Sequence, residues 1–100
     1  MNYHVVVSHR NKVATLASNK SLDYLPHTFI KESTKNVDPE NLASYLKYLI
    51  IDDKGDPHGM MLWVKAEGHK LPILMVQLSN RNILMMYNHK GHLISKDSIK

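Results

Sequence analysis

Seven of the 100 residues are histidines, and several stand beside a lysine in short polar segments. His69 precedes Lys70, His89 precedes Lys90, and His92 follows shortly after. An ammonium group attracts phosphate, and an imidazole with a pKa near ~6.5 can donate, accept or shuttle a proton at neutral pH. These residue types could bind a polyanion or cleave RNA, although turn tips also collect polar residues simply for solvation.

Three apolar runs in the second half of the chain would position these side chains. The runs span residues 60–64, 71–78 and 83–87, turn residues follow each of them, and residues 92–95 add a fourth short strand. Connections this short join antiparallel neighbours, because a parallel return needs a crossover of about a dozen residues or more. The sequence therefore predicts a four-stranded antiparallel meander.

The first and third turns of such a meander lie at the same end of the sheet, about 10 Å apart. They gather five side chains into what we call the histidine rim: His69, Lys70, His89, Lys90 and His92. His58, Asn80 and Arg81 go to the opposite end. Our candidate binding residues for a partner are Lys70, His89, Lys90, Arg81 and, if it is exposed, Trp63.

The closing stretch from residue 82 to residue 95 contains the turn Asn88-His89-Lys90-Gly91. It resembles the final hairpin of small bacterial ribonuclease toxins of the colicin D and RelE kind, in which an Asn/Asp-x-Lys-Gly turn joins the last two strands of a basic meander. The likeness covers about a seventh of the chain. It implies a ribonuclease whose catalytic groups would be His69, His89, His92 and Lys90.

We predict no metal site and no cofactor. The chain has no cysteine, and His89 and His92 have neither acidic neighbours nor helical i, i+4 spacing. The acidic segment 52–56 has Lys54 where a calcium-binding loop needs an oxygen ligand, so a simple turn is the better interpretation. With four glycines and no glycine-rich phosphate loop or Gly-x-Ser-x-Gly motif, nucleotide hydrolysis and serine-nucleophile chemistry are disfavoured.

The first third of the chain has weaker patterns. Residues 3–8 are predicted to form a strand, and residues 13–16 a second strand after a polar turn. Between residues 17 and 37, Pro26 is expected to break any helix, and residues 28–30 could form a short strand.

The clearest boundary in the sequence is Asp38-Pro39-Glu40, which predicts the start of a helix. Its apolar stripe would be Leu42, Tyr45, Leu46 and Leu49, at positions i, i+3, i+4 and i+7. Residues 48–52 could either continue this helix or begin a strand. We predict one α+β domain over residues 1–100, with N-terminal strands, one central amphipathic helix and the C-terminal meander.

The predicted strands are apolar on both faces, which is typical of a sheet covered on both sides. One helix covers only one face, so the second face would be covered either by residues 1–37 or by another chain, a second copy or a target protein. Five methionines lie in these strands, and we expect most of them to fill the core: Met60, Met61, Met75, Met85 and Met86.

The composition, with 43% hydrophobic and 22% charged residues, is that of a folded globular protein. The N-terminus lacks a signal-peptide pattern and no apolar run could span a bilayer, so we expect a cytoplasmic protein without membrane contact. The formal charge of +4 favours polyanionic or acidic partners. Our function hypothesis is a small non-enzymatic binding or inhibitory protein, of the kind that phages and mobile elements encode. It would act on a protein or nucleic-acid partner, or as a homodimer, through its sheet face or basic rim, and the alternative is the ribonuclease.

Overall fold

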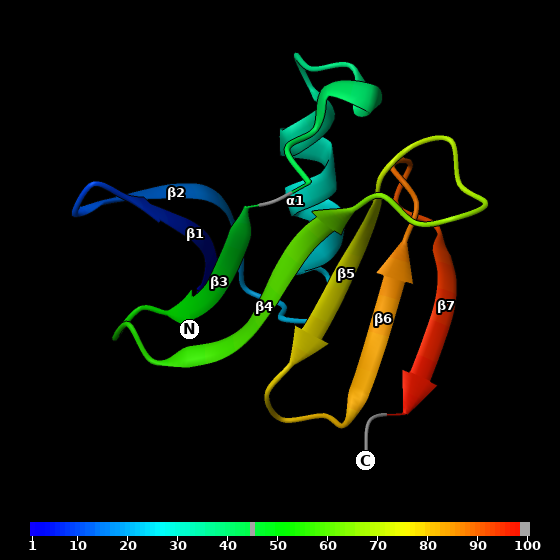
Figure 1. Cartoon of the computed structure of the whole chain (residues 1–100). Coiled ribbons are helices and arrows are strands. Elements are labelled where there is room, and N and C mark those ends of the chain that lie inside the picture. The colour runs from blue at the N-terminus through cyan, green and yellow to red at the C-terminus, as the bar shows by residue number, and fades with distance from the viewer. Residues whose placement is uncertain (45, 99–100) are drawn as a thin grey trace.

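A computed structural model of the chain describes residues 1–44 and 46–98, the side chains of His9, Asp97 and Ser98 excepted. Seven strands form one antiparallel sheet in the order β2-β1-β3-β4-β5-β6-β7 (Figure 1). The elements are β1 (Tyr3–His9), β2 (Lys12–Asn19), α1 (Leu25–Thr34), the short 3-10 turn η1 (Pro39–Asn41), β3 (Lys47–Asp52), β4 (Pro57–Val64), β5 (Ile73–Leu78), β6 (Ile83–Tyr87) and β7 (Leu93–Ser98).

The predicted strands of the second half are confirmed as β4 to β7, and the two N-terminal strands as β1 and β2. The α+β class is also confirmed, but the sheet extends beyond the predicted four-stranded meander because β3 joins β1 to β4. Arg10 and Asn11 connect β1 to β2 with φ angles of 50° and 65°, which are the positive values that a two-residue hairpin turn requires. The pairing register shifts at Val5/Val6, Ile50/Ile51 and Met86/Tyr87, which marks three bulges.

The helix lies earlier in the chain than the sequence predicted. α1 occupies part of the region where we expected Pro26 to exclude a helix and residues 28–30 to form a strand, and both expectations are wrong. Pro26 stands in the first turn of α1, where a missing N–H breaks no intrahelical hydrogen bond. Ser21 helps to start the helix, because its Oγ accepts from the N–H of Tyr24 at 3.2 Å.

The predicted helix after Asp38 is wrong beyond its first turn. η1 begins at Pro39 as expected, but Leu42 is already extended, and residues 47–52 form β3. Burial in β3 alternates, with Tyr48, Ile50 and Asp52 buried, so a period of two overrides the helical spacing. Tyr45, a member of the predicted helical stripe, lies outside the described residues.

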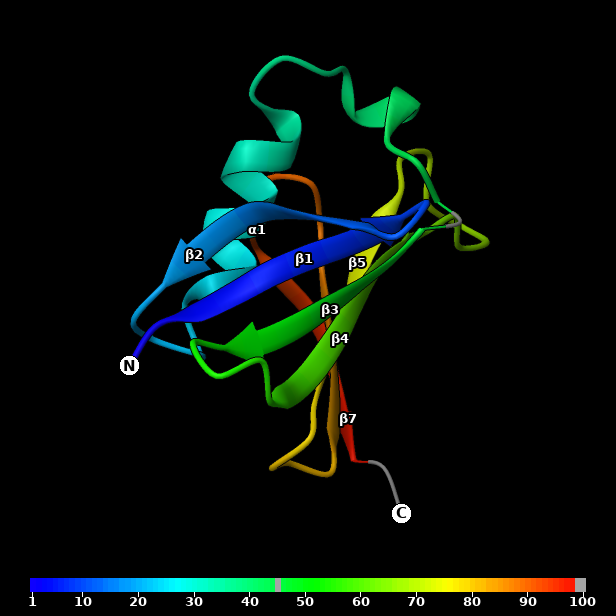
Figure 2. The ribbon, with the colours of Figure 1, turned by 90° about the vertical axis from the view of Figure 1, so that its left-hand side faces the viewer.

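The helix α1 covers one side of the sheet, and in the view of Figure 1 it lies behind β4 and β5 (Figures 1 and 2). Its residues Leu25, Phe29 and Ile30 pack against the inward-facing side chains of the strands. The buried core consists of Val5, Ala17, Leu25, Phe29, Ile30, Leu42, Tyr48, Ile50, Met61, Trp63, Leu74, Val76, Leu78, Met85 and Tyr87. Within residues 1–44 and 46–98, no helix has the length and apolar character needed to cross a bilayer.

Candidate functional site

The side of the sheet that faces away from α1 remains uncovered by any described element. Side chains alternate along a strand, so the neighbours of the core residues in β3 to β6 point to this side. We call the eight apolar ones that are at least partly exposed the open face: Leu49, Ile51, Met60, Leu62, Val64, Met75, Leu84 and Met86. Ile73 points to the same side but is only 4% exposed. The alternative in which residues 1–37 cover the second face is therefore wrong, because α1 covers only the core side.

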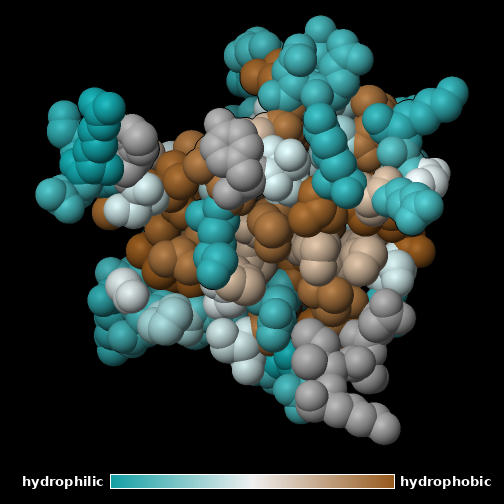
Figure 3. Space-filling view, viewed as in Figure 1, coloured by the Kyte–Doolittle hydropathy of each residue, from teal (hydrophilic) through white to brown (hydrophobic). Residues whose placement is uncertain are grey.

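Strand register arranges these side chains in continuous rows. Leu62 pairs with Lys47 on one side and Met75 on the other, and Met75 pairs in turn with Met86. Leu49, Met60, Gln77 and Leu84 form the next row. Leu49 is 45% exposed, and the other apolar members are half-buried. Figure 3 shows hydrophobic side chains gathered in the middle of this face, with hydrophilic ones around them.

The methionines divide between the two faces. Met61 and Met85 are buried in the core, whereas Met60, Met75 and Met86 lie on the open face. Our expectation that most of the five fill the core is therefore wrong. The thioether is flexible and polarizable, so these three side chains can adapt to the shape of a contacting surface.

A groove of about 210 Å³ runs across the open face and is lined by Leu49, Pro57, Gly59, Met60, Gln77 and Ser79. Gly59 permits the strands to approach here, because a Cβ at this position would collide with the backbone oxygen of Gln77. Any side chain at position 59 would push β4 away from β5 and widen the sheet at the groove.

The histidine rim lies where the meander places it. The loop between β4 and β5 carries His69 and Lys70, the β6–β7 turn carries His89, Lys90 and His92, and both are at the same end of the sheet (Figure 1). His89 is half-buried, and the other four side chains are exposed. No described contact joins members of the rim, so the role of these residues in catalysis or binding stays a prediction.

Asn88 shapes the turn that carries three of these residues. Its side-chain oxygen Oδ1 accepts from the N–H groups of Lys90 and His92, each at 2.9 Å. The Asn88 N–H donates to the carbonyl of His92, the Gly91 N–H donates to the carbonyl of Asn88, and Gly91 has a φ of 88°. This five-residue turn holds Lys90 and His92 away from the sheet.

Asp52 builds a second turn of the same kind between β3 and β4. Its Oδ1 accepts from the N–H groups of Lys54 at 2.8 Å and Asp56 at 3.0 Å, while Oδ2 is 2.9 Å from Nε2 of His58. Asp52 is only 5% exposed, and the hydrogen bond from His58, followed by those from the two N–H groups, lowers the pKa of its carboxyl although burial opposes the shift.

The other two candidate binding residues differ in accessibility, because the Arg81 side chain is 39% exposed whereas Trp63 is buried. Arg81 lies at the opposite end from the rim, as predicted, and pairs with Asp23 at 2.5 Å, which raises the pKa of the guanidinium. This ion pair joins the β5–β6 turn to the segment before α1. Trp63 is 1% exposed and belongs to the core, so it is no anchor on the open face.

One polar chain that sequence reasoning missed joins Ser18, His4 and Asp53. His4 Nε2 lies 2.7 Å from the Asp53 carboxylate, and His4 Nδ1 lies 2.7 Å from the Ser18 hydroxyl. A carboxylate can only accept, so Nε2 donates, and in neutral His4 Nδ1 accepts the Ser18 proton. The His4 hydrogen bond, followed by the N–H of Asn2, lowers the pKa of Asp53.

The hydrogen bonds from Ser18 through His4 to Asp53 tie β1 to both β2 and the β3–β4 turn, and we assign them a structural role. The three residues are far apart in sequence, and only the pairing of β1 with β2 and β3 brings them together. Among the described residues, no three His, Asp or Glu side chains come close enough together to hold a metal ion.

Comparison with protein-family models, curated proteins and solved structures found no match. Functional inference therefore depends on the geometry of this chain.

Proposed function

We propose that this chain is a binding protein that docks its open face onto an apolar surface of a partner protein with an acidic border. The observation that carries the proposal is the set of aliphatic and methionine side chains, interrupted by Gln77, on the side of the sheet that α1 does not cover. Contiguous apolar patches of a few hundred Å² on a protein surface are often interaction sites.

The size of the patch indicates what else the partner must contact. Four strands about 4.8 Å apart and about five residues along each strand give roughly 300 Å². A stable interface buries about 800 Å² on each partner. More than half of the interface must therefore come from the polar surface around the open face.

Three lysines border this patch, and the strand register also pairs the acidic Asp97 with Leu84. Lys47 begins the row that contains Leu62 and Met75, and Lys65 and Lys70 follow β4 and precede β5. All three lysines are exposed. With a formal net charge of +4, two copies of the chain repel each other, whereas an acidic border on a different protein is attracted.

Nucleic acid is a poorer match for the open face. Proteins that bind single strands stack the bases on aromatic side chains, and the eight open-face residues are all aliphatic or methionine. A basic rim alone would give weak binding that depends steeply on salt.

Leu62→Glu tests the proposal, with Val13→Glu as the matched control. Leu62 lies in the middle of the open face, while Val13 is 65% exposed on β2, away from it. Proteins captured from the native host by the wild-type chain are identified, purified and titrated by calorimetry. We expect Leu62→Glu to weaken binding roughly 30-fold or more, as loss of a hot-spot residue does, while Val13→Glu binds like the wild-type chain.

Light scattering at high protein concentration and titration at several salt concentrations complete the test. We expect a monomeric chain whose affinity for the purified partner falls as salt is raised. A dimer that Leu62→Glu dissociates would assign the open face to a second copy and refute the proposal. Binding that is indifferent to Leu62→Glu, or that requires RNA, would refute it as well.

A further inference from the structure

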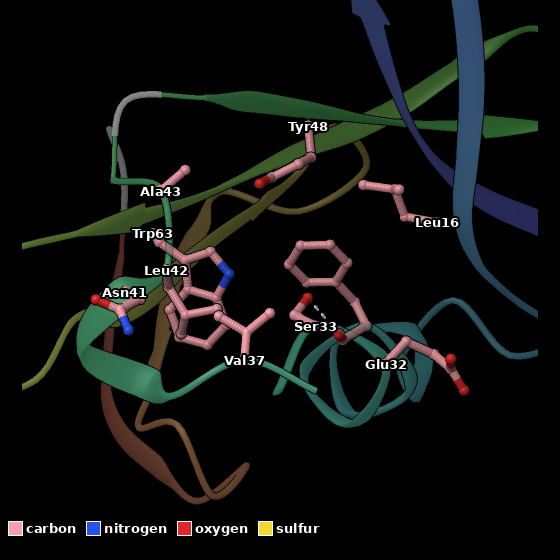
Figure 4. Close-up of a pocket in the computed structure, with 10 residues that line it drawn as sticks. Leu16, Glu32, Ser33, Val37, Asn41, Leu42, Ala43, Tyr48 and Trp63 are labelled. Carbon is pink, nitrogen blue, oxygen red and sulfur yellow. Dashed lines mark hydrogen bonds between the residues drawn. The ribbon is translucent and has the colours of Figure 1, made fainter. Parts of the chain in front are cut away.

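A second hollow lies on the other side of the sheet, between α1, the segment after it, β3 and β4. Its volume is about 300 Å³, and its apolar lining includes Leu16, Phe29, Val37, Leu42, Tyr48 and Trp63 (Figure 4). Leu16 and Val37 are 38% and 42% exposed and mark the mouth, whereas Phe29 and Trp63 are each 1% exposed and form the floor. This size is at the lower end of the range for small-molecule sites.

The floor of the hollow contains one polar atom without a partner. Trp63 Nε1 is the one buried side-chain nitrogen or oxygen of the described residues that makes no hydrogen bond. Buried indole N–H groups normally donate to an acceptor, so this one needs an explanation. In Figure 4 the indole nitrogen of Trp63 points into the hollow, toward the side on which Tyr48 and α1 lie.

The remaining polar groups around the hollow restrict what can bind. Ser33 is occupied, because its hydroxyl donates to the carbonyl of Phe29 at 2.6 Å. Glu32 is an exposed carboxylate beside the hollow, so an anionic ligand would be repelled. Asn41 adds an exposed amide and Tyr48 a phenol to the lining. The other lining side chains are apolar, and the floor offers a ligand the N–H of Trp63 as a donor.

We propose that this hollow binds a small, uncharged, mostly apolar molecule with a single carbonyl oxygen, which accepts the hydrogen bond of Trp63 Nε1. The hydrocarbon part lies between Leu16, Phe29 and Leu42. Because Nε1 is buried, side chains around it must shift for the carbonyl to reach it. This site is on the opposite side of the sheet from the open face, so it is independent of the proposed protein docking.

The chain has one tryptophan, so a single indole N–H resonance in a ¹H–¹⁵N spectrum reports the site. The probes are cyclohexyl methyl ketone and ethylcyclohexane, which has nearly the same shape but no acceptor. We expect the ketone to move the indole resonance downfield in a saturable way. We expect ethylcyclohexane to bind more weakly and to cause no downfield shift.

Three variants make the result specific. Trp63→Phe keeps an aromatic floor without the N–H and should weaken ketone binding by about fivefold to tenfold, the effect of one lost hydrogen bond, while leaving ethylcyclohexane unchanged. The affinity for this variant is followed by the shifts of backbone amides around the hollow. Ala43→Leu fills the hollow and should abolish binding of both probes, whereas Val13→Glu should bind them like the wild-type chain.

The proposal is overturned if the ketone leaves the indole resonance in place at saturating concentration, or if Ala43→Leu binds it as well as the wild-type chain does. It is also overturned if both probes bind equally to wild type and Trp63→Phe, because the N–H would then contribute nothing. Failure of the open-face variants to affect partner binding would leave this result untouched, so the two proposals fail separately.

Discussion

The turns at Asp52 and Asn88 show the same local structure built twice, at opposite ends of the sheet. In each, the side-chain Oδ1 of the first residue accepts from the N–H groups two and four residues later. In each, the N–H of the first residue donates to the carbonyl of the fifth residue. A Lys-Gly pair lies within both turns, and its glycine has a positive φ, 86° for Gly55 and 88° for Gly91.

The two turns differ in how the first residue uses its second side-chain polar atom, Oδ2 in Asp52 and Nδ2 in Asn88. Asp52 is buried and binds His58 through Oδ2, whereas the half-buried Asn88 uses only its oxygen in the described contacts. The Asn/Asp-x-Lys-Gly pattern, which carries the likeness to ribonuclease toxins, thus recurs away from the histidine rim. Turn geometry accounts for Asn88 and Gly91 without any catalytic role.

The largest expected effect on stability comes from removing the Asp52 side chain, and Asn88, its smaller counterpart in the other turn, serves as the comparison. Asn88→Ala should lower the free energy of unfolding by about 1 kcal/mol, because two N–H groups lose their acceptor but remain near water. Asp52→Ala should lower it clearly more, because His58 also loses its partner in a buried setting. Urea denaturation followed by Trp63 fluorescence measures both. Equal losses would show that the His58 contact contributes nothing.

Next in size are the two glycines. Gly55→Ala and Gly91→Ala should each lower the free energy of unfolding by about 1–2 kcal/mol, because an L-residue with a side chain is strained in the left-handed region. A Cβ at position 55 would meet open space, and one at position 91 would lie 3.4 Å from Nδ1 of His27. The same denaturation assay should therefore give similar losses. A loss confined to one turn would contradict their structural equivalence.

A smaller effect is expected from acid. The pKa of Asp52 is lowered below its ordinary value of 3.8, so the carboxylate stabilises the fold above that pH, and this contribution disappears as pH falls through the lower pKa of the folded state. The melting temperature of the wild-type chain should exceed that of Asp52→Asn at pH 7, and the gap should close on acidification below about pH 4. A gap that is constant from pH 7 to pH 3 would remove the charge argument.

The smallest effect on stability should come from the rim side chains. His89→Ala and Lys90→Ala should change the free energy of unfolding by less than about 0.5 kcal/mol, because backbone groups and Asn88 hold the turn. We also expect purified wild-type protein to leave RNA intact. Cleavage that His89→Ala abolishes would restore the ribonuclease alternative.

The strands were predictable where apolar runs alternate with turn chemistry. Their apolar character on both sides predicted a sheet covered on both faces, but it did not decide between residues 1–37 and another chain as the cover of the second face. The helix was not predictable, because a proline that disrupts a helix in its interior is tolerated in the first turn, where Pro26 stands. Around Leu49, the apolar residues fit both the spacing of a helix and that of a strand over a short run. The pairing of β3 with β1 and β4 makes this segment a strand. Such pairing is a property of the whole sheet.

The candidate sites were predictable to different degrees. Sequence order alone placed the histidine rim, because turns of a meander alternate between its ends. The hollow beneath Trp63 was not foreseeable, since it depends on how α1 and the segment after it pack on the sheet. The link from Ser18 through His4 to Asp53 likewise requires strand register that the sequence does not contain in any local pattern.

The three bulges in the sheet also affect how a partner can approach. Bulges bend and twist strands, and here the β1–β2 end of the sheet curls toward α1, which contacts both of these strands (Figure 2). A sheet that wraps around its helix is convex on the outside. A flat surface would touch only the crest of such a convex sheet, so the docking proposed above would be better served by a concave partner surface wide enough for the middle strands.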